Sequence, residues 1–227
     1  MSIMYIEQNK RGNMKLIKKM TYLSLFSLLP FVSNADEGEK IYMKGGENPM
    51  AIACMTCHGM NGEGLAAAGY PSVAGKSAIY LAKQVNDFKE GNRTHPVMDG
   101  VAKALSEDEI TEVALYMQNL PAPNVPNIPR STQPTDLGSQ LALRGDWSRN
   151  IPECIACHGP AGVGVGDAFP KLAGQSQLYI INQMNAWKNG TRKNDENDLM
   201  GHIARSLNDE EIQVVATYFS NLGTVGK

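Results

Sequence analysis

Residues 54–58 read Cys54-Met55-Thr56-Cys57-His58, and residues 154–158 read Cys154-Ile155-Ala156-Cys157-His158, so that one C-x-x-C-H pattern occurs twice and uses all four cysteines. Two cysteines at this spacing, followed at once by histidine, are typical of the attachment site of a c-type haem. The thiols bind the porphyrin vinyl groups and the adjacent imidazole coordinates the iron. The sequence therefore predicts two covalently attached haem c groups.

A C-x-x-C pair also occurs in zinc sites, in redox-active dithiols and in disulfides. A zinc site needs four protein ligands, and no second Cys or His pair lies close to either motif in sequence. A thioredoxin-like dithiol lies in a βαβ pattern, which the surroundings do not show. An oxidising compartment could join each pair as a disulfide. Because the whole pattern recurs in matching surroundings, haem is the preferred interpretation.

The first 35 residues are expected to be a signal peptide. A basic region (Lys15, Lys18 and Lys19) precedes an apolar run over 20–32, and Ser33-Asn34-Ala35 resembles a cleavage site. The apolar run is shorter than the ~20 residues of a membrane-spanning helix. Export to the periplasm is therefore expected. An uncleaved membrane anchor and a true start at Met14 are the alternatives.

The charge of the expected mature chain is acidic. The 21 basic and 23 acidic residues fall to 16 and 22 without the first 35 residues, for a net charge near −6. This balance argues against nucleic acid as a partner. It does not define a protein partner, because a contact patch can differ from the mean charge.

The two motifs lie in a repeat of about 100 residues, which suits a small domain. The offset is 100 near the motifs, then 99, and then 102 after a three-residue insertion. Matched positions include Gly38 with Gly138, Gly64 with Gly164, Pro71 with Pro170, Gly75 with Gly174, Tyr80 with Tyr179, Gln84 with Gln183, Arg93 with Arg192, Met98 with Met200, and Ile110 with Ile212.

Prolines divide the two copies. Residues 121–135 include Pro121, Pro123, Pro126, Pro129 and Pro134. Proline at this density blocks helix formation and favours an extended, semi-rigid connector. We therefore expect a first domain over 36–120, a linker over 121–135 and a second domain over 136–227.

Each copy is expected to be all-helical, since no run alternates as a strand would. Ser106 with Glu109, and Asn208 with Glu211, have the spacing of helix capping boxes. Apolar stripes follow at matching positions. They consist of Ile110, Val113, Ala114, Met117 and Leu120 in the first copy and Ile212, Val215, Ala216, Phe219 and Leu222 in the second.

Gly38 and Gly138 fall in the first short helix of each copy. A residue without a side chain would allow the first and last helices to cross closely, although a turn glycine is the simpler alternative.

Met98 and Met200 are the candidates for the second axial ligand of each iron. They lie 40 and 42 residues after the motif histidines, in loops leading into the last helix. No other histidine or methionine has a matching partner: His95 matches no histidine, His202 matches Gly100, Met60 matches Pro160, Met117 matches Phe219 and Met184 matches Val85. A thioether ligand favours ferrous iron. Ordinary packing is the alternative role for both.

Two further matched pairs have candidate roles. The carbonyls of Pro71 and Pro170 could accept the second N–H of the motif imidazoles, which commonly binds an acceptor; a turn proline is the alternative. Arg93 and Arg192 could pair with haem propionates, since arginine suits carboxylates. Ordinary surface charge is an equal alternative for these arginines.

Each half resembles a class I cytochrome c domain, and the tandem over 36–222 resembles the dihaem cytochrome c4 family. The resemblance implies two all-helical domains, each wrapped around one covalent haem. It implies that Cys54, Cys57, His58 and Met98 hold the first haem, that Cys154, Cys157, His158 and Met200 hold the second, and that His58, Met98, His158 and Met200 bind the iron.

The implied function is single-electron transfer in the periplasm between respiratory partners, with no substrate bonded. A quinol-oxidising complex or another donor, and a terminal oxidase as acceptor, would be the partners, and association with a membrane surface stays open. The alternative is a dihaem relay subunit of a larger dehydrogenase, such as a flavocytochrome. A dihaem peroxidase or a gas sensor needs an open iron, which the paired methionines argue against.

Overall fold

The computed structural model describes residues 35–122 and 124–223. The expected signal peptide, its cleavage site and the alternative start at Met14 lie outside the described residues, apart from Ala35. None of the helices in the described ranges has the length and apolar character needed to cross a membrane.

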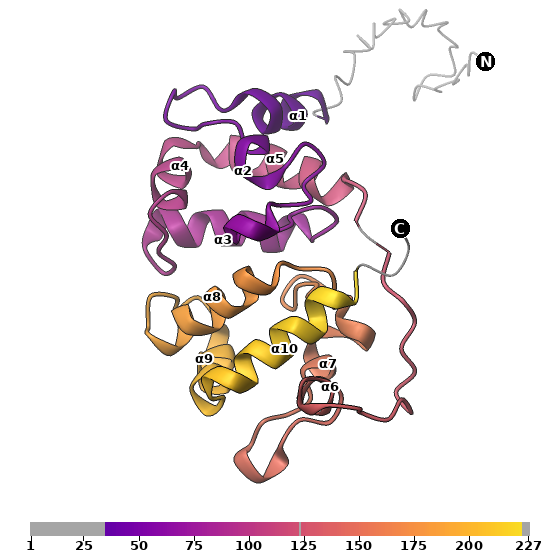
Figure 1. Ribbon diagram of the computed structural model, residues 1–227. Coiled ribbons are helices and arrows are strands. Elements are labelled where there is room, and N and C mark those ends of the chain that lie inside the picture. The colour runs from indigo at the N-terminus through magenta and orange to yellow at the C-terminus, as the bar shows by residue number, and fades with distance from the viewer. Residues whose placement is uncertain (1–34, 123, 224–227) are drawn as a thin grey trace, which may run out of the picture. The chain divides into compact units, whose positions relative to one another are not determined.

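The first half contains five α-helices and one short 3₁₀ helix (Figure 1). These are α1 (Ala35–Lys44), α2 (Met55–His58), η1 (Ala66–Ala68), α3 (Ala78–Glu90), α4 (Met98–Ala104) and α5 (Glu107–Asn119). Helices α1 and α3 both pack on α5, and α3 also contacts α4.

The second half repeats the five α-helices of the first, and its three 3₁₀ turns lie at positions other than the one that matches η1. It contains α6 (Leu137–Arg144), η2 (Trp147–Arg149), α7 (Cys154–His158), η3 (Pro160–Gly162), α8 (Gln177–Lys188), η4 (Glu196–Asp198), α9 (Leu199–Ser206) and α10 (Asp209–Asn221). Within the described residues only isolated bridges occur in place of strands. The all-α prediction is therefore confirmed.

Both predicted capping boxes are present. At the start of α5 the Ser106 side chain accepts the Glu109 N–H, and the Glu109 carboxylate accepts the Ser106 N–H. Asn208 and Glu211 repeat this exchange at α10. The predicted stripes face separate cores, one in each half. The buried members are Ile110, Val113, Ala114, Met117, Ile212, Val215, Ala216 and Phe219.

Gly38 and Gly138 lie where the first and last helices of each half touch. A Cβ on Gly38 would lie 2.3 Å from the Glu112 carbonyl oxygen on α5. A Cβ on Gly138 would lie 2.5 Å from the Val214 carbonyl oxygen on α10. Such approaches are too close for any side chain, so the helices cross here only because these residues are glycine. Both glycines lie inside helices, so the turn alternative is wrong.

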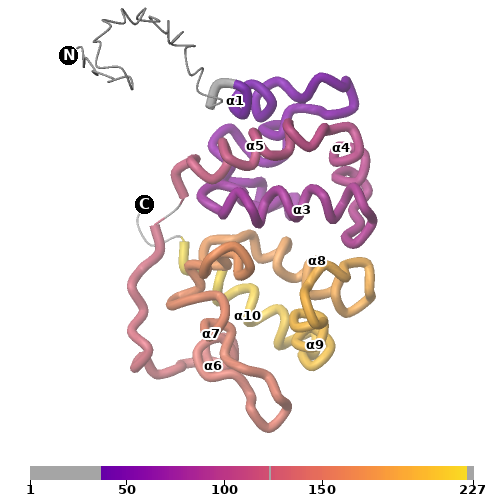
Figure 2. Tube along the Cα trace, turned by 180° about the vertical axis from the view of Figure 1, so that it is seen from behind, coloured from indigo at the N-terminus to yellow at the C-terminus, as the bar shows by residue number. Residues whose placement is uncertain are grey.

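The α3 and α8 helices lie side by side where the two halves meet, as Figures 1 and 2 show from opposite sides. Helix α8 also contacts η1. The backbones of Arg93 and Arg192 form an antiparallel bridge across the junction. Hydrogen bonds on either side of it run from the Thr94 N–H to the Thr191 carbonyl (3.0 Å) and from the Lys193 N–H to the Asn92 carbonyl (2.7 Å). The described residues between α5 and α6 form no helix.

Candidate haem-binding sites

One continuous cavity is lined by residues of both halves and contains all the predicted site residues in its wall. These residues are Cys54, Cys57, His58 and Met98 from the first half and Cys154, Cys157, His158 and Met200 from the second. The motif residues reach it from α2 and α7, and the methionines from α4 and α9. The fold thus assembles two matching donor sets that are far apart in sequence.

Each motif imidazole is held by the carbonyl of the matched proline. The distance from Nδ1 to the carbonyl oxygen is 3.0 Å for His58 and Pro71 and 2.8 Å for His158 and Pro170. With the carbonyl as acceptor, Nδ1 carries the proton and Nε2 keeps its lone pair for a metal. Burial lowers the pKa of both histidines, which favours the neutral, ligating form. The structure therefore supports the acceptor role of both prolines over that of plain turn residues.

Glycine allows the proline segment to return to the motif. Gly64 donates its N–H to the His58 carbonyl, and Gly164 does the same for His158. Both glycines have positive φ, of 78° and 89°. A Cβ on Gly64 would lie 2.6 Å from the carbonyl carbon of Pro71. A larger residue would therefore push the proline carbonyl away from the imidazole.

No disulfide joins any of the four cysteines in the structure, so the disulfide alternative is not what it contains. Burial raises the pKa of Cys54 and of Cys154 to about 12, which keeps these two thiols protonated at neutral pH. In the described ranges, no group of three or more His, Cys, Asp or Glu side chains is placed to hold a metal ion. Two thiols and one imidazole per motif are the set that haem attachment uses, since the porphyrin brings further ligands for its iron.

The remaining walls of the cavity also fit a porphyrin. Apolar side chains from the helices of each half line it. They include Leu81, Val85, Leu105 and Val113 in the first half and Ile180, Met184, Leu207 and Val215 in the second. The indole Nε1 of Trp187, which also lines the cavity, is buried and has no hydrogen-bond partner among the described residues. A haem propionate would supply the acceptor that this donor lacks.

Met98 and Met200 do not lie in loops, which corrects the sequence expectation. Met98 is the first residue of α4 and Met200 is the second residue of α9. Local hydrogen bonds initiate both helices: the His95 Nδ1 accepts the Met98 N–H at 3.3 Å, and the Asp195 carboxylate accepts the Gly201 N–H at 3.0 Å. Both methionines therefore stand on backbone that is fixed at a helix start.

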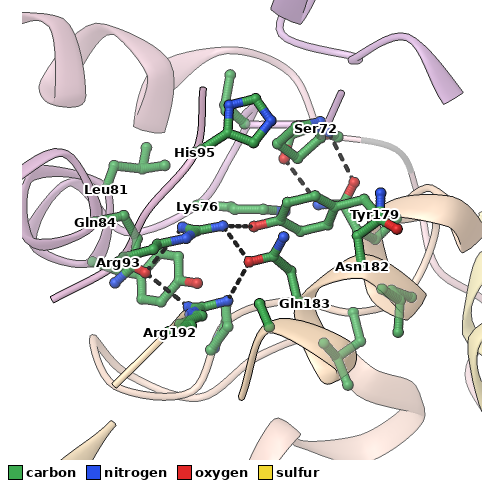
Figure 3. Close-up of a pocket in the computed structure, with 18 of the residues that line it drawn as sticks. Ser72, Lys76, Leu81, Gln84, Arg93, His95, Tyr179, Asn182, Gln183 and Arg192 are labelled. Carbon is green, nitrogen blue, oxygen red and sulfur yellow. Dashed lines mark hydrogen bonds between the residues drawn. The ribbon is translucent and has the colours of Figure 1, made fainter. Parts of the chain in front are cut away.

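Arg93 and Arg192 are buried at the junction of the two halves, so the surface-charge alternative is wrong. Arg93 donates to Gln183 at 2.6 Å and to Gln84 at 3.2 Å. Arg192 donates to Gln84 at 2.8 Å and to Gln183 at 3.0 Å (Figure 3). Arg93 also donates to the Tyr179 hydroxyl at 2.8 Å. Both guanidinium groups line the cavity.

Gln84 and Gln183 are a repeated pair whose role the sequence alone does not predict. Each carbonyl oxygen accepts from both arginines, one of its own half and one of the other. Their repetition in the sequence could have indicated this role, because a junction between two similar halves can use matched polar residues from both. Lys76 also lines the cavity, and the repeat does not point to it because its match in the second half is Gln175.

Comparisons with known proteins agree with this geometry. The model of the cytochrome c family matches residues 35–121 and 138–223. A thiosulfate dehydrogenase electron acceptor from Stutzerimonas stutzeri is 55% identical over 196 residues, which are 86% of this chain and 91% of that protein. A cytochrome c4 from Pseudomonas aeruginosa is 33% identical over 180 residues, 76% of this chain and 85% of that protein.

A solved structure is also similar. It is a thiosulfate dehydrogenase from Marichromatium purpuratum in the as-isolated form, with a TM-score of 0.73 and 37% identity. The similarity covers 82% of this chain but only 40% of that one.

Proposed function

The chain belongs to the cytochrome c family, as a tandem, dihaem member of the cytochrome c4 kind, and from this premise we propose that it accepts electrons from a thiosulfate dehydrogenase. The coarser function is established by the family: the protein is an electron-transfer protein with two covalent haem c groups, and it is not an enzyme. What we propose beyond this is the identity of the electron donor.

The residues of the chain attach each haem and fix the orientation of the imidazole beside it. Haem iron supplies a one-electron couple between the ferric and ferrous states. The thiols of each motif provide covalent attachment, and the prolines fix the imidazole orientation through the Nδ1 hydrogen bonds. We propose that Met98 and Met200 would each provide a second protein ligand to one iron, so that neither iron would have a free position for a substrate.

The observation that carries the choice of donor is the 55% identity to a protein named for accepting electrons from thiosulfate dehydrogenase, across 91% of its length. That level of identity is higher than the 33% shared with the cytochrome c4 from Pseudomonas aeruginosa. We propose the periplasm as the location, in keeping with the signal-like N-terminal segment. A terminal oxidase is the proposed acceptor, and it rests on the family resemblance alone.

The test is a reconstituted electron transfer. The oxidised holoprotein is mixed with a thiosulfate dehydrogenase and thiosulfate, and the growth of the ferrous α-band is followed in time. We expect catalytic amounts of the dehydrogenase to reduce both haems. Omitting either the dehydrogenase or thiosulfate gives the background, and a cytochrome c4 serves as the comparison carrier. Reduction no faster than this background, in a protein with both haems attached, would refute the donor.

The relay-subunit alternative is favoured by one observation, the similarity to 40% of a longer thiosulfate dehydrogenase chain. A permanent complex would keep the two haems beside the catalytic part of one dehydrogenase. Size-exclusion chromatography of the native protein from its own periplasm separates the two readings. Co-elution with the dehydrogenase at physiological salt supports the relay subunit, and elution as a free chain of its own mass supports the diffusing carrier.

A further inference from the structure

Lys76 is a buried cation in the cavity wall that has no counterion in the described part of the chain. It lies between Pro71 and the N-terminal cap of α3, and its residue is only 9% exposed. None of the described side chains or carbonyls accepts a hydrogen bond from its ammonium group. Burial and the nearby Lys171 lower the pKa of Lys76 to about 8. A buried ammonium without a counterion is costly, so the position points to an anionic ligand.

The surrounding groups do not provide that anion. Arg93 and Arg192 line the same cavity, and their hydrogen bonds go to neutral partners. Glu153 is the acidic residue in the described cavity wall, and it pairs with Arg130 at 2.9 Å. The cavity is therefore positively charged where the two halves meet. A ligand that enters with carboxylate groups would neutralise it.

The two halves differ at the positions that face this ligand. Lys76 matches Gln175, whose side chain is occupied: it accepts the Ser72 N–H at 2.9 Å and donates to the Ser72 carbonyl at 3.0 Å. Trp187, the unpartnered indole donor, matches Phe88, which has no donor. Each half thus contributes one unpartnered donor to the cavity. The donor is charged in the first half and neutral in the second.

We propose that the Lys76 ammonium binds a propionate carboxylate of the first haem and makes that haem easier to reduce. The inference rests on the two attached haems but not on the identity of the electron donor. A nearby positive charge stabilises the ferrous state, which has one negative charge more than the ferric state. An indole N–H at the second haem brings no net charge. Removal of Lys76 should therefore lower the potential of one haem only.

The experiment compares variants of the holoprotein by spectroelectrochemical redox titration at pH 8. Lys76→Met keeps the length of the side chain without its charge, and Lys76→Arg keeps the charge. Lys44→Met removes an exposed lysine of the same half as the matched control. The corresponding change in the second half is Trp187→Phe, which copies the residue of the first half. Haem methyl resonances in NMR spectra assign each potential to its haem.

We expect Lys76→Met to lower the equilibrium constant for reduction of the first haem about tenfold, or 59 mV for a one-electron couple. Lys76→Arg and Lys44→Met should stay within threefold of the wild type, and Trp187→Phe should leave the first haem unchanged. Equal potentials in Lys76→Met and Lys44→Met, with two haems attached in both, would overturn the proposal. A wild-type potential that depends on sulfate, and loses this dependence in Lys76→Met, would also overturn it by identifying a diffusible anion.

A measurement on the wild type decides the matter if Lys76→Met does not fold. The pKa of the Lys76 ammonium is followed in the ferrous holoprotein by ¹⁵N NMR, with Lys76→Arg used for assignment. A carboxylate partner should hold this pKa above the ordinary lysine value of about 10.4. A pKa near 8 would show that no propionate binds the group. Neither readout uses thiosulfate, so a failure of the proposed donor leaves this test intact.

Discussion

The methionine segments of the two halves reach the same cavity with different local chemistry. In the first half the His95 ring accepts N–H groups of Val97 and Met98, each at 3.3 Å. In the second half the segment is longer, and Asn197 and Asp198 adopt positive φ values of 57° and 56° before α9. The two methionines are at matched positions, although the residues and the backbone that precede them differ between the halves. Both methionines therefore line the same cavity although the chain reaches them by different routes.

The helix crossings show the opposite behaviour. Gly38 on α1 faces a backbone carbonyl of α5, and Gly138 on α6 faces one of α10. The distances for an added Cβ are nearly the same, 2.3 and 2.5 Å. Here the backbone itself forms the contact, so no other residue can replace glycine. Positions set by backbone contact repeat in the sequence, whereas positions set by a side chain can diverge between the halves.

Replacing the matched methionines should give the largest effect and tests whether the halves are equivalent. In Met98→Ala or Met200→Ala, loss of the proposed thioether should open one iron, so that about half of the haem binds carbon monoxide. The absorption spectrum of the dithionite-reduced protein, with and without the gas, measures this. Met60→Ala is the control, because Met60 is 58% exposed and matches a proline. If only one variant binds the gas, the other methionine is not a ligand.

Substituting the crossing glycines should give the next largest effect, and a similar one in each half. Gly38→Ala and Gly138→Ala should each lower the free energy of unfolding by about 1–3 kcal/mol, because the added methyl overpacks the crossing. Denaturant unfolding of the holoprotein, followed by circular dichroism, measures the loss. Gly100→Ala is the matched control, since a Cβ there meets nothing within 4 Å. Unfolding of Gly38→Ala at the midpoint of Gly100→Ala would contradict the close crossing.

The smallest expected effect is a difference between the halves in how an acidic residue makes stability depend on pH. Hydrogen bonds from Arg149 hold the pKa of Glu211 below its usual range, and the shortest of them is 2.6 Å. A lowered folded pKa gives stability above the unfolded value of about 4.3, which is lost as the pH falls through the folded value. In Glu109, the matched residue, burial acts to raise the pKa, but N–H donors of Ser106 and Glu47 outweigh it.

Arg149→Gln should therefore destabilise the protein modestly at pH 7 and progressively less below about pH 4. Thermal unfolding of the wild type and the variant across this range measures the convergence. Lys188→Gln, which removes a pair with the exposed Asp209, is the control and should change little. A constant difference between the two curves at all pH values would argue against ionic pairing of Glu211.

The sequence alone predicts the helical class, the two haem motifs, the capping boxes and the helix crossings, because each depends on local spacing or on a repeated residue. The motif imidazoles and their proline carbonyls lie 13 and 12 residues apart, which is still within one loop. The junction could not be predicted in this way. Gln84 and Arg192 lie 108 residues apart, and their contact exists only after the halves have packed together.

Lys76 shows a second limit of sequence reasoning. Lysine is mostly exposed in proteins, and neither its neighbours nor the repeat marked this one as buried. Its burial follows from how the halves pack, with Gln175 and Ser72 linked beside it. The prediction that the methionines lie in loops was wrong for a related reason. The hydrogen bonds that start α4 and α9 come from His95 and Asp195, and neither is repeated.

The reciprocal bonds at the junction also bear on how the protein behaves on dilution. Arg93 bonds to Gln183 while Arg192 bonds to Gln84, which is the exchange seen across the two-fold axis of a symmetric dimer. At these four residues the two halves therefore contact each other as identical subunits would, but the linker joins them in one chain. Such a tether holds the partners at an effective concentration in the millimolar range. The paired arrangement should accordingly persist at concentrations where a true dimer of this contact would separate.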